Sequence, residues 1–186
     1  MSSFLVMECK GKAPIGRVDV VTDIEDAPWQ TGALVKNPSD VIVYKTHSTR
    51  RGNLKAMYGL SVPIIRQDLL QALLDAGVDN LQLFDAVVRD PVTGAEHTNY
   101  RAFNVVGVVM AADMGKSELM HEDTLTGVDR DFAHLVLDEG RIRSGLLLFR
   151  LAEATNAIVV HEKIKDMIEA RNIEGMVFYE PGEWSG

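Results

Sequence analysis

Hydrophobic residues recur at helical spacing in two segments of the chain. In the first, Leu69 and Leu73 are four positions apart, and Gly77 follows where helices commonly end in a left-handed residue. In the second, Ile164 and Ile168 repeat the same spacing. The spacing predicts two amphipathic helices, over residues 66–76 and 161–171.

Short apolar or alternating stretches, bounded by Gly, Pro, Asn and Asp, surround these helices and are typical of β-strands. Gly94, after Asp90-Pro91, indicates a hairpin turn. Gly107 lies inside an apolar run and indicates a bulge or a close backbone approach. The expected strands are Ser3–Met7, Val41–Tyr44, Leu81–Val88, Tyr100–Ala112, Leu146–Leu151, Ala157–Val160 and Met176–Tyr179, with weaker candidates at Val18–Val21, Gly32–Val35 and Phe132–Leu137.

These elements predict an α+β fold in which an antiparallel or mixed sheet is covered by two principal helices. We expect the main domain over residues 56–186. The first part of the chain, residues 1–55, forms a β-rich lobe that either stands apart or belongs to the same domain.

The two predicted helices also echo one another. An offset of 95 positions places residues 62–86 on residues 157–181 without an identical residue, yet the apolar pattern agrees through the helix and the following strand. Gly77 falls on Asn172, and these residue types best tolerate the left-handed conformation. Either the chain contains a structural repeat or two unrelated helix–strand units look alike. Two acidic positions recur as well, Asp79 with Glu174 and Asp85 with Glu180.

Charge and cysteine content narrow the functional classes. The net charge is −8 and Cys9 is the one cysteine, which excludes an internal disulfide and a multi-cysteine metal site. The longest nearly apolar stretch, residues 105–112, is far shorter than the roughly 20 residues that span a bilayer, and the N-terminus lacks the basic start of a secretory signal. We expect a cytoplasmic protein that binds neither membranes nor nucleic acids and favours a basic protein as its partner.

Three segments resemble a known bacterial family: Leu148-Phe149-Arg150-Leu151, then Ile158–Ala170, then Gly175–Pro181. The family, formerly a domain of unknown function, is grouped with the immunity proteins of polymorphic toxin systems. The resemblance covers roughly residues 54–181 and implies an antidote that binds a cognate toxin, with no catalytic residues. Relatives often place a serine at the start of each helix. Arg66 and His161 stand there in this chain, so a serine cap is missing.

The residues capable of chemistry form no established constellation. His121-Glu122 and His161-Glu162 are adjacent pairs, and adjacent side chains on a helix point about 100° apart, so neither pair chelates one ion. Gly115-Lys116-Ser117 lacks the preceding glycine of a phosphate-binding loop, because position 110 is Met110. We therefore predict no metal, no cofactor and no catalytic residue.

One long polar segment remains without a helical or strand period. Residues 113–131 carry six acids and two bases, a net charge of −4. The segment is either a solvated loop or an acidic recognition surface for a basic toxin. Tryptophan often anchors interfaces, so Trp184 is a further candidate. The alternative is that Trp184 packs the C-terminus onto the body. The candidate partner-binding residues are Glu118, Glu122, Asp123, Asp129, Asp131 and Trp184.

The sequence thus predicts an immunity protein that neutralises its toxin by stoichiometric occlusion. The alternatives are a small enzyme with an acid-based site and an adaptor module of a secretion system. For an enzyme, the first acids to consider are those that the echo makes equivalent, at positions 79, 85, 174 and 180.

Overall fold

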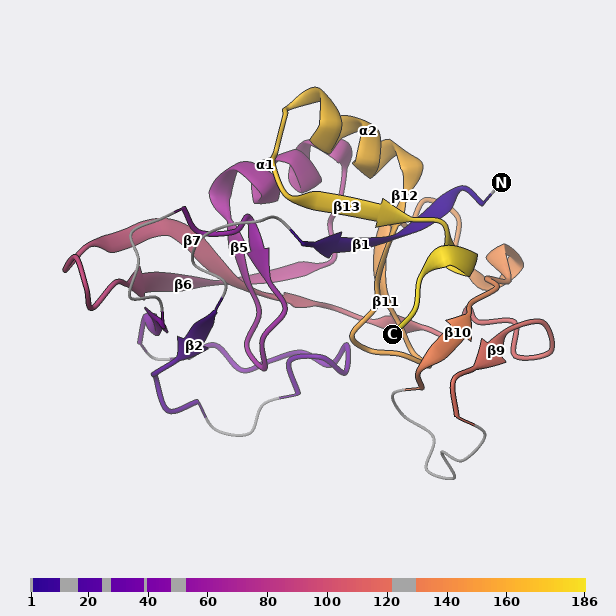
Figure 1. Ribbon diagram of the computed structural model, residues 1–186, viewed down its shortest axis with the longest axis horizontal. Helices are drawn as coiled ribbons and strands as arrows, with labels where there is room; N and C mark the ends of the chain where they lie inside the picture. The colour runs from indigo at the N-terminus through magenta and orange to yellow at the C-terminus, as the bar shows by residue number, and fades with distance from the viewer. Residues whose placement is uncertain (1, 11–16, 25–27, 39, 48–52, 122–129) are drawn as a thin grey trace.

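Two α-helices lie where the apolar spacing predicts them, α1 at Gln67–Ala76 and α2 at Glu162–Ala170. The computed structural model describes residues 2–10, 17–24, 28–38, 40–47, 53–121 and 130–186. In it the two helices lie side by side over the strands (Figure 1). The ammonium group of Lys163 on α2 donates to the carbonyl oxygen of Ala76 on α1 at 2.8 Å. Arg171 forms an ion pair with Asp75 between the same two helices.

Both helices are followed by a residue in the left-handed conformation, as the sequence predicts, whereas their N-terminal caps differ from each other. Gly77 ends α1 with a φ of 105°. Asn172 follows α2 with a φ of 52° and is the one non-glycine residue with positive φ in the described chain. At the start of α2, Nδ1 of His161 accepts a hydrogen bond from the backbone N–H of Lys163 at 3.2 Å. Histidine thus replaces serine as a cap, whereas Arg66 caps α1 with no side-chain bond.

The strands form two large mixed sheets and one small one. The order in the six-stranded sheet is β2-β3-β6-β7-β5-β4, where β3 and β6 run parallel. The order in the five-stranded sheet is β13-β1-β12-β11-β8, where β8 and β11 run parallel. All other neighbours in these two sheets are antiparallel. A two-stranded sheet pairs β9 with β10.

The bounds of the strands are as follows. The six-stranded sheet contains β2 (Val18–Val20), β3 (Ile42–Thr46), β4 (Met57–Tyr58), β5 (Ile64–Arg66), β6 (Leu81–Arg89) and β7 (Glu96–Val105). The five-stranded sheet contains β1 (Phe4–Cys9), β8 (Val108–Val109), β11 (Leu148–Leu151), β12 (Ile158–His161) and β13 (Met176–Tyr179). The remaining elements are β9 (Glu118–Leu119), β10 (Phe132–His134) and the 3₁₀ turns η1 (Glu139–Arg141) and η2 (Pro181–Glu183).

The prediction of one long strand over Tyr100–Ala112 is wrong, because the backbone breaks at Gly107. The φ of Gly107 is 88°, and its N–H donates to the carbonyl of Gly32 at 2.7 Å. A Cβ on Gly32 would lie 2.6 Å from the backbone of Gly107, so the two segments meet where only glycine fits. The close approach therefore requires glycine at position 32, whereas Gly107 is favoured by its positive φ; the segment around Gly32 is not a strand.

The first third of the chain contributes to both large sheets. β1 lies between β12 and β13, whereas β2 and β3 lie beside β6. In Figure 1, β1 crosses the middle of the molecule and β2 lies at the opposite end from β10. Strands from before residue 55 are therefore found in both large sheets, together with strands from after it.

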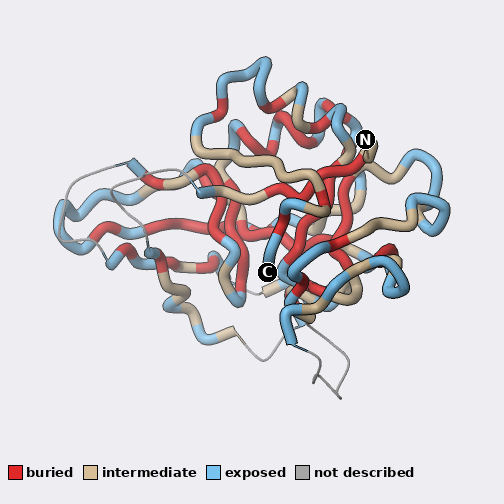
Figure 2. The backbone as a smooth tube through the Cα atoms, turned by 45° about the vertical axis from the view of Figure 1, so that its right-hand side comes forward, coloured by how far each residue is buried: buried red, intermediate tan, exposed pale blue. Residues whose placement is uncertain are grey.

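Three apolar clusters fill the interior. One lies between the helices and both large sheets and includes Leu73, Ile168 and Phe103. A second covers the other face of the six-stranded sheet, and a third covers the other face of the five-stranded sheet. Figure 2 shows the buried stretches in the middle of the tube and the exposed ones on the outer loops. None of the helices in the described chain is long and apolar enough to span a membrane.

Candidate functional site

The ends of the predicted acidic segment are fixed by the short pair β9–β10. Phe132 is fully buried and lies opposite Leu119, and both side chains belong to the cluster beneath the five-stranded sheet. The backbone N–H of Met120 donates to the carbonyl of Asp131 at 2.9 Å. The core therefore anchors the two strands of this pair.

One of the predicted acidic residues, Glu118, lies on β9, and a second, Asp131, directly precedes β10. Glu118 and Asp131 are both exposed, and neither forms an ion pair with another described residue. Glu122, Asp123 and Asp129 lie outside the described residues. The structure therefore places two candidate acids beside the β9–β10 pair, with both side chains exposed.

The turn before β9 neutralises part of the segment's charge. The ammonium group of Lys116 lies 2.8 Å from a carboxylate oxygen of Asp113. This ion pair, with a further hydrogen bond from the backbone N–H of Gly115, lowers the pKa of Asp113. Asp113 therefore shapes a turn and is not part of a free acidic surface.

A second basic residue of the segment is also engaged. A guanidinium nitrogen of Arg130 contacts the sulfur of Met114 at 3.9 Å.

Exposed methionines accompany the acids, a feature that the sequence analysis did not use. The exposed large hydrophobic residues of this part of the chain are Val108, Met110, Met114 and Met120, and Met110 is 68% exposed. Methionine is flexible and polarisable, and it is common on surfaces that adapt to a partner. We call the exposed residues Val108, Met110, Met114, Glu118, Met120 and Asp131 the β8–β10 surface.

Trp184, the aromatic candidate, is not part of an exposed surface. Its side chain is 3% exposed and packs in the cluster beneath the five-stranded sheet. Its indole N–H donates to a carboxylate oxygen of Glu8 on β1 at 2.8 Å. The indole therefore fastens the C-terminus to the body, as the packing alternative predicted. Trp29 is likewise 3% exposed and stacks edge-on against Phe84 at 5.0 Å between ring centroids.

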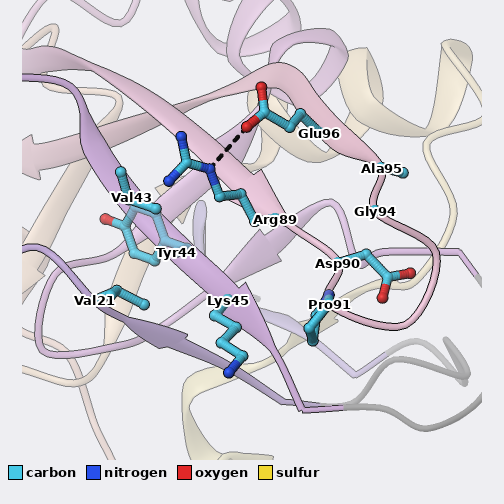
Figure 3. Close-up of a pocket in the computed structure, with 10 residues that line it drawn as sticks. All are labelled: Val21, Val43, Tyr44, Lys45, Arg89, Asp90, Pro91, Gly94, Ala95 and Glu96. Carbon is cyan, nitrogen blue, oxygen red and sulfur yellow. Dashed lines mark hydrogen bonds and ion pairs between the residues drawn. The ribbon is translucent and has the colours of Figure 1, made fainter.

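Two surface hollows were candidates for a small-molecule site. The first, of about 310 Å³, lies between β3 and the β6–β7 hairpin and is lined by Val21, Val43 and the charged groups of Figure 3. Figure 3 shows the guanidinium of Arg89 turned to Glu96, at 2.8 Å. Asp90 accepts hydrogen bonds from Thr93 and from the backbone N–H of Val92, which lower the pKa of its carboxyl group. The acids of this hollow are thus engaged in the hairpin itself.

The second hollow, of about 360 Å³, lies where β13 ends. Ser2, His134, Glu139 and Glu180 contribute its polar lining. The hydroxyl of Ser2 donates to Glu139 at 2.7 Å and lowers the pKa of that carboxyl group. Nδ1 of His134 lies 3.0 Å from the carbonyl oxygen of Gly182 and must carry the proton to donate to it. The carbonyl oxygen of Glu180 accepts from the N–H of Glu183 at 2.9 Å, and its carboxylate forms no ion pair with another described residue.

The four acids of the enzyme alternative lie along two strands. Asp79 precedes β6 and Asp85 lies within it, six residues or about 20 Å apart along an extended chain, and Glu174 and Glu180 flank β13 with the same separation in sequence. Asp85 is exposed and faces Arg101 at 3.6 Å. No group of three His, Cys, Asp or Glu side chains that could hold a metal ion is present among the described residues.

The chain matches no family model, and no curated protein is similar to it in sequence. The resemblance to bacterial immunity proteins therefore stays a prediction.

Proposed function

We propose that this protein is an immunity protein, which binds a cognate toxin and neutralises it by stoichiometric occlusion. The observation that carries the proposal is the β8–β10 surface, where exposed methionines and two exposed carboxylates lie on or beside strands anchored in the core. Apolar side chains with adaptable shape supply contact area, and a surrounding excess of one charge selects an oppositely charged partner. The partner is therefore a basic toxin.

Occlusion requires no reactive group in this chain. The charged side chains of the two hollows are mostly bonded to neighbours within the fold, such as Arg89 to Glu96 and Ser2 to Glu139. A surface that binds as a preformed unit loses little conformational entropy on association. The anchoring of β9 and β10 by Leu119 and Phe132 supports such preformed binding.

Co-expression with the product of the neighbouring gene tests the proposal, scored by survival of the cells and by co-purification of the two proteins. The double variant Glu118→Lys with Asp131→Lys should slow association about tenfold at low salt and weaken its salt dependence. The double variant Asp79→Lys with Asp166→Lys is the matched control, because it changes the net charge equally at exposed positions elsewhere. Turnover of a small molecule by the purified protein, or equal effects of both variants, would contradict the proposal.

A further inference from the structure

β13 forms an open edge of the five-stranded sheet. In the described chain it pairs with β1 and with no other strand. Its four residues, Met176 to Tyr179, carry no charge, and all are partly exposed. Natural edge strands are usually protected by lysine, proline, a bulge or a covering segment. None of these protections lies within β13, which pairs with β1 in an unbroken register.

The backbone of β13 presents unpaired polar groups along this edge. The N–H of Lys10 donates to the carbonyl of Gly175 at 2.9 Å, which identifies these two residues as a hydrogen-bonded pair. Bonded and non-bonded pairs alternate along antiparallel strands. Met176 and Phe178 therefore direct their N–H and C=O groups away from β1. No hydrogen bond between described residues ends on these four groups.

The counterpart of this edge in the other large sheet is the outer edge of β6. β6 holds the place in the six-stranded sheet that β13 holds in the five-stranded one, each next to the middle strand of its unit. Beyond β6, β3 adds in parallel, pairing Ile42 with Ala86 and Lys45 with Arg89. This contact lies on the part of β6 that extends past the positions equivalent to β13. The fold thus accepts a parallel, β-branched strand on the outer side of β6, beyond the stretch that corresponds to β13.

Acidic side chains flank the open edge at both ends. Glu174 is exposed before β13, Glu180 is half-buried directly after it, and neither forms an ion pair with a described residue. A second copy pairing antiparallel through β13 would bring Glu174 of each molecule beside Glu180 of the other. Like charges opposite one another destabilise a strand pair. The flanks therefore disfavour self-association and favour a strand with basic residues at its ends.

We propose that the edge of β13 is a docking site for an extended, apolar strand of another protein with lysine or arginine at both ends. The strand extends the five-stranded sheet by one, through backbone bonds to Met176 and Phe178 and ion pairs with Glu174 and Glu180. Strand addition of this kind draws its affinity from the backbone and its specificity from side chains. The proposal rests on the proposed function and goes beyond it, because β13 lies at the opposite edge of the five-stranded sheet from β8 and would give the toxin a second contact.

A synthetic peptide tests the edge without the toxin. The probe is residues 41–45 of this chain, Val-Ile-Val-Tyr-Lys, with one lysine added at the N-terminus. Amide hydrogen exchange of the full-length protein is measured with and without the peptide. Exchange at Met176 and Phe178 should slow when the peptide is present. The same peptide with N-methylated backbone amides should bind at least tenfold more weakly, because it loses backbone hydrogen bonds.

Charge reversal at the flanks provides the matched comparison. The double variant Glu174→Lys with Glu180→Lys should bind the lysine-ended peptide roughly fivefold more weakly and bind a glutamate-ended peptide in its place. Asp79→Lys, at the equivalent exposed position of the other unit, should leave binding unchanged.

Three results would overturn the inference: unchanged exchange at Met176 and Phe178, equal binding of the N-methylated peptide, or a dimer in which these two amides are already protected. None of these results depends on the toxin. A failure of strand docking is therefore distinguishable from a failure of toxin neutralisation, which co-expression scores.

Discussion

The molecule contains two units with the same skeleton. The first unit is β4-β5-α1-β6-β7, and the second is β11-β12-α2-β13 with β1 in the place of β7. In the first, Ala102 on the middle strand pairs with Ile64 on one side and Phe84 on the other. In the second, Val6 pairs with Val159 and Tyr179. The outer partners in the two units are 95 positions apart, as the echo in the sequence predicted.

Hydrogen bonds at the helix ends repeat with the same offset. The N–H of Val78 donates to the carbonyl of Leu73 at 3.0 Å, and the N–H of Ile173 donates to that of Ile168 at 3.3 Å. The N–H of Val106 donates to Asn80 at 2.8 Å, the counterpart of the bond from Lys10 to Gly175. This agreement down to single bonds distinguishes a structural repeat from two helix–strand units that merely look alike.

The difference between the units lies in the source of the middle strand. β7 follows β6 through a hairpin, whereas β1 comes from the other end of the chain. A sheet requires matching register and alternating side chains, and it does not require that neighbouring strands follow one another in sequence. The comparison teaches that the unit is a packing arrangement, which the chain can assemble from distant segments.

The largest expected effects test whether the two cores contribute equally. Leu69 and Ile164 are equivalent, and both are fully buried beneath their helices. Leu69→Ala and Ile164→Ala should each lower the free energy of unfolding by about 2–5 kcal/mol, because each leaves a cavity. Denaturation in urea measures both values. A loss at one position with little change at the other would show that one unit dominates stability.

The next effect concerns the two left-handed helix ends. Gly77 has a φ of 105°, where a side chain is strained, and Asn172 has a φ of 52°, which asparagine tolerates. Gly77→Ala should lower the free energy of unfolding by about 1–2 kcal/mol. Asn172→Gly should change it by only a few tenths of a kcal/mol. Thermal unfolding followed by circular dichroism compares the variants, and equal losses would refute the assignment of strain to Gly77.

A smaller effect separates the two tryptophans that cover the outer faces of the sheets. Trp184→Phe removes the bond to Glu8 and should cost about 1 kcal/mol of unfolding free energy. The buried indole N–H of Trp29 has no hydrogen-bond partner among described residues. Trp29→Phe should therefore cost less than Trp184→Phe. Chemical denaturation gives the order, and the reverse order would contradict these contacts.

The smallest effect is the ion pair that joins the helices of the two units. Arg171 and Gln71 hold the pKa of Asp75 below its ordinary value of 3.8. A lowered carboxyl pKa stabilises the fold above the ordinary value, and this stability is lost as the pH falls through the folded-state pKa. Asp75→Asn should thus be slightly less stable than the natural protein at pH 6, and equally stable near pH 2. Added salt should shrink the difference at pH 6, because the pair is exposed.

Several elements were predictable from local pattern. The spacing of Leu69, Leu73, Ile164 and Ile168 predicted both helices within one residue at each end. Short apolar or alternating stretches predicted β3, β6, β11, β12 and β13 to within a few residues. The acidic segment was visible as well, because charge is read directly from composition. The methionines were equally visible, and their combination with the apolar run before them was the signal that the sequence analysis missed.

Other features depended on contacts that no local pattern encodes. The break at Gly107 was misjudged because its cause, Gly32, lies 75 positions away. Trp184 was included among the partner contacts because the groups that bury it, Glu8 and the core beneath the five-stranded sheet, are distant in sequence. The sequence identified Glu118 and Asp131 as candidate acids, but it did not predict that they lie beside one short pair of strands.

The sequence by itself determined the helices, most strands, the net charge and the repeated unit, because each depends on residue types within a few positions or at one fixed offset. Only the tertiary structure decided that β1 completes the second unit, that Trp184 is buried and that β13 has an open edge. These outcomes depend on which strands find each other across the chain. Pairing of β1 with β12 joins residues more than 150 positions apart, where the sequence pattern sets which faces are apolar but not which partner covers them.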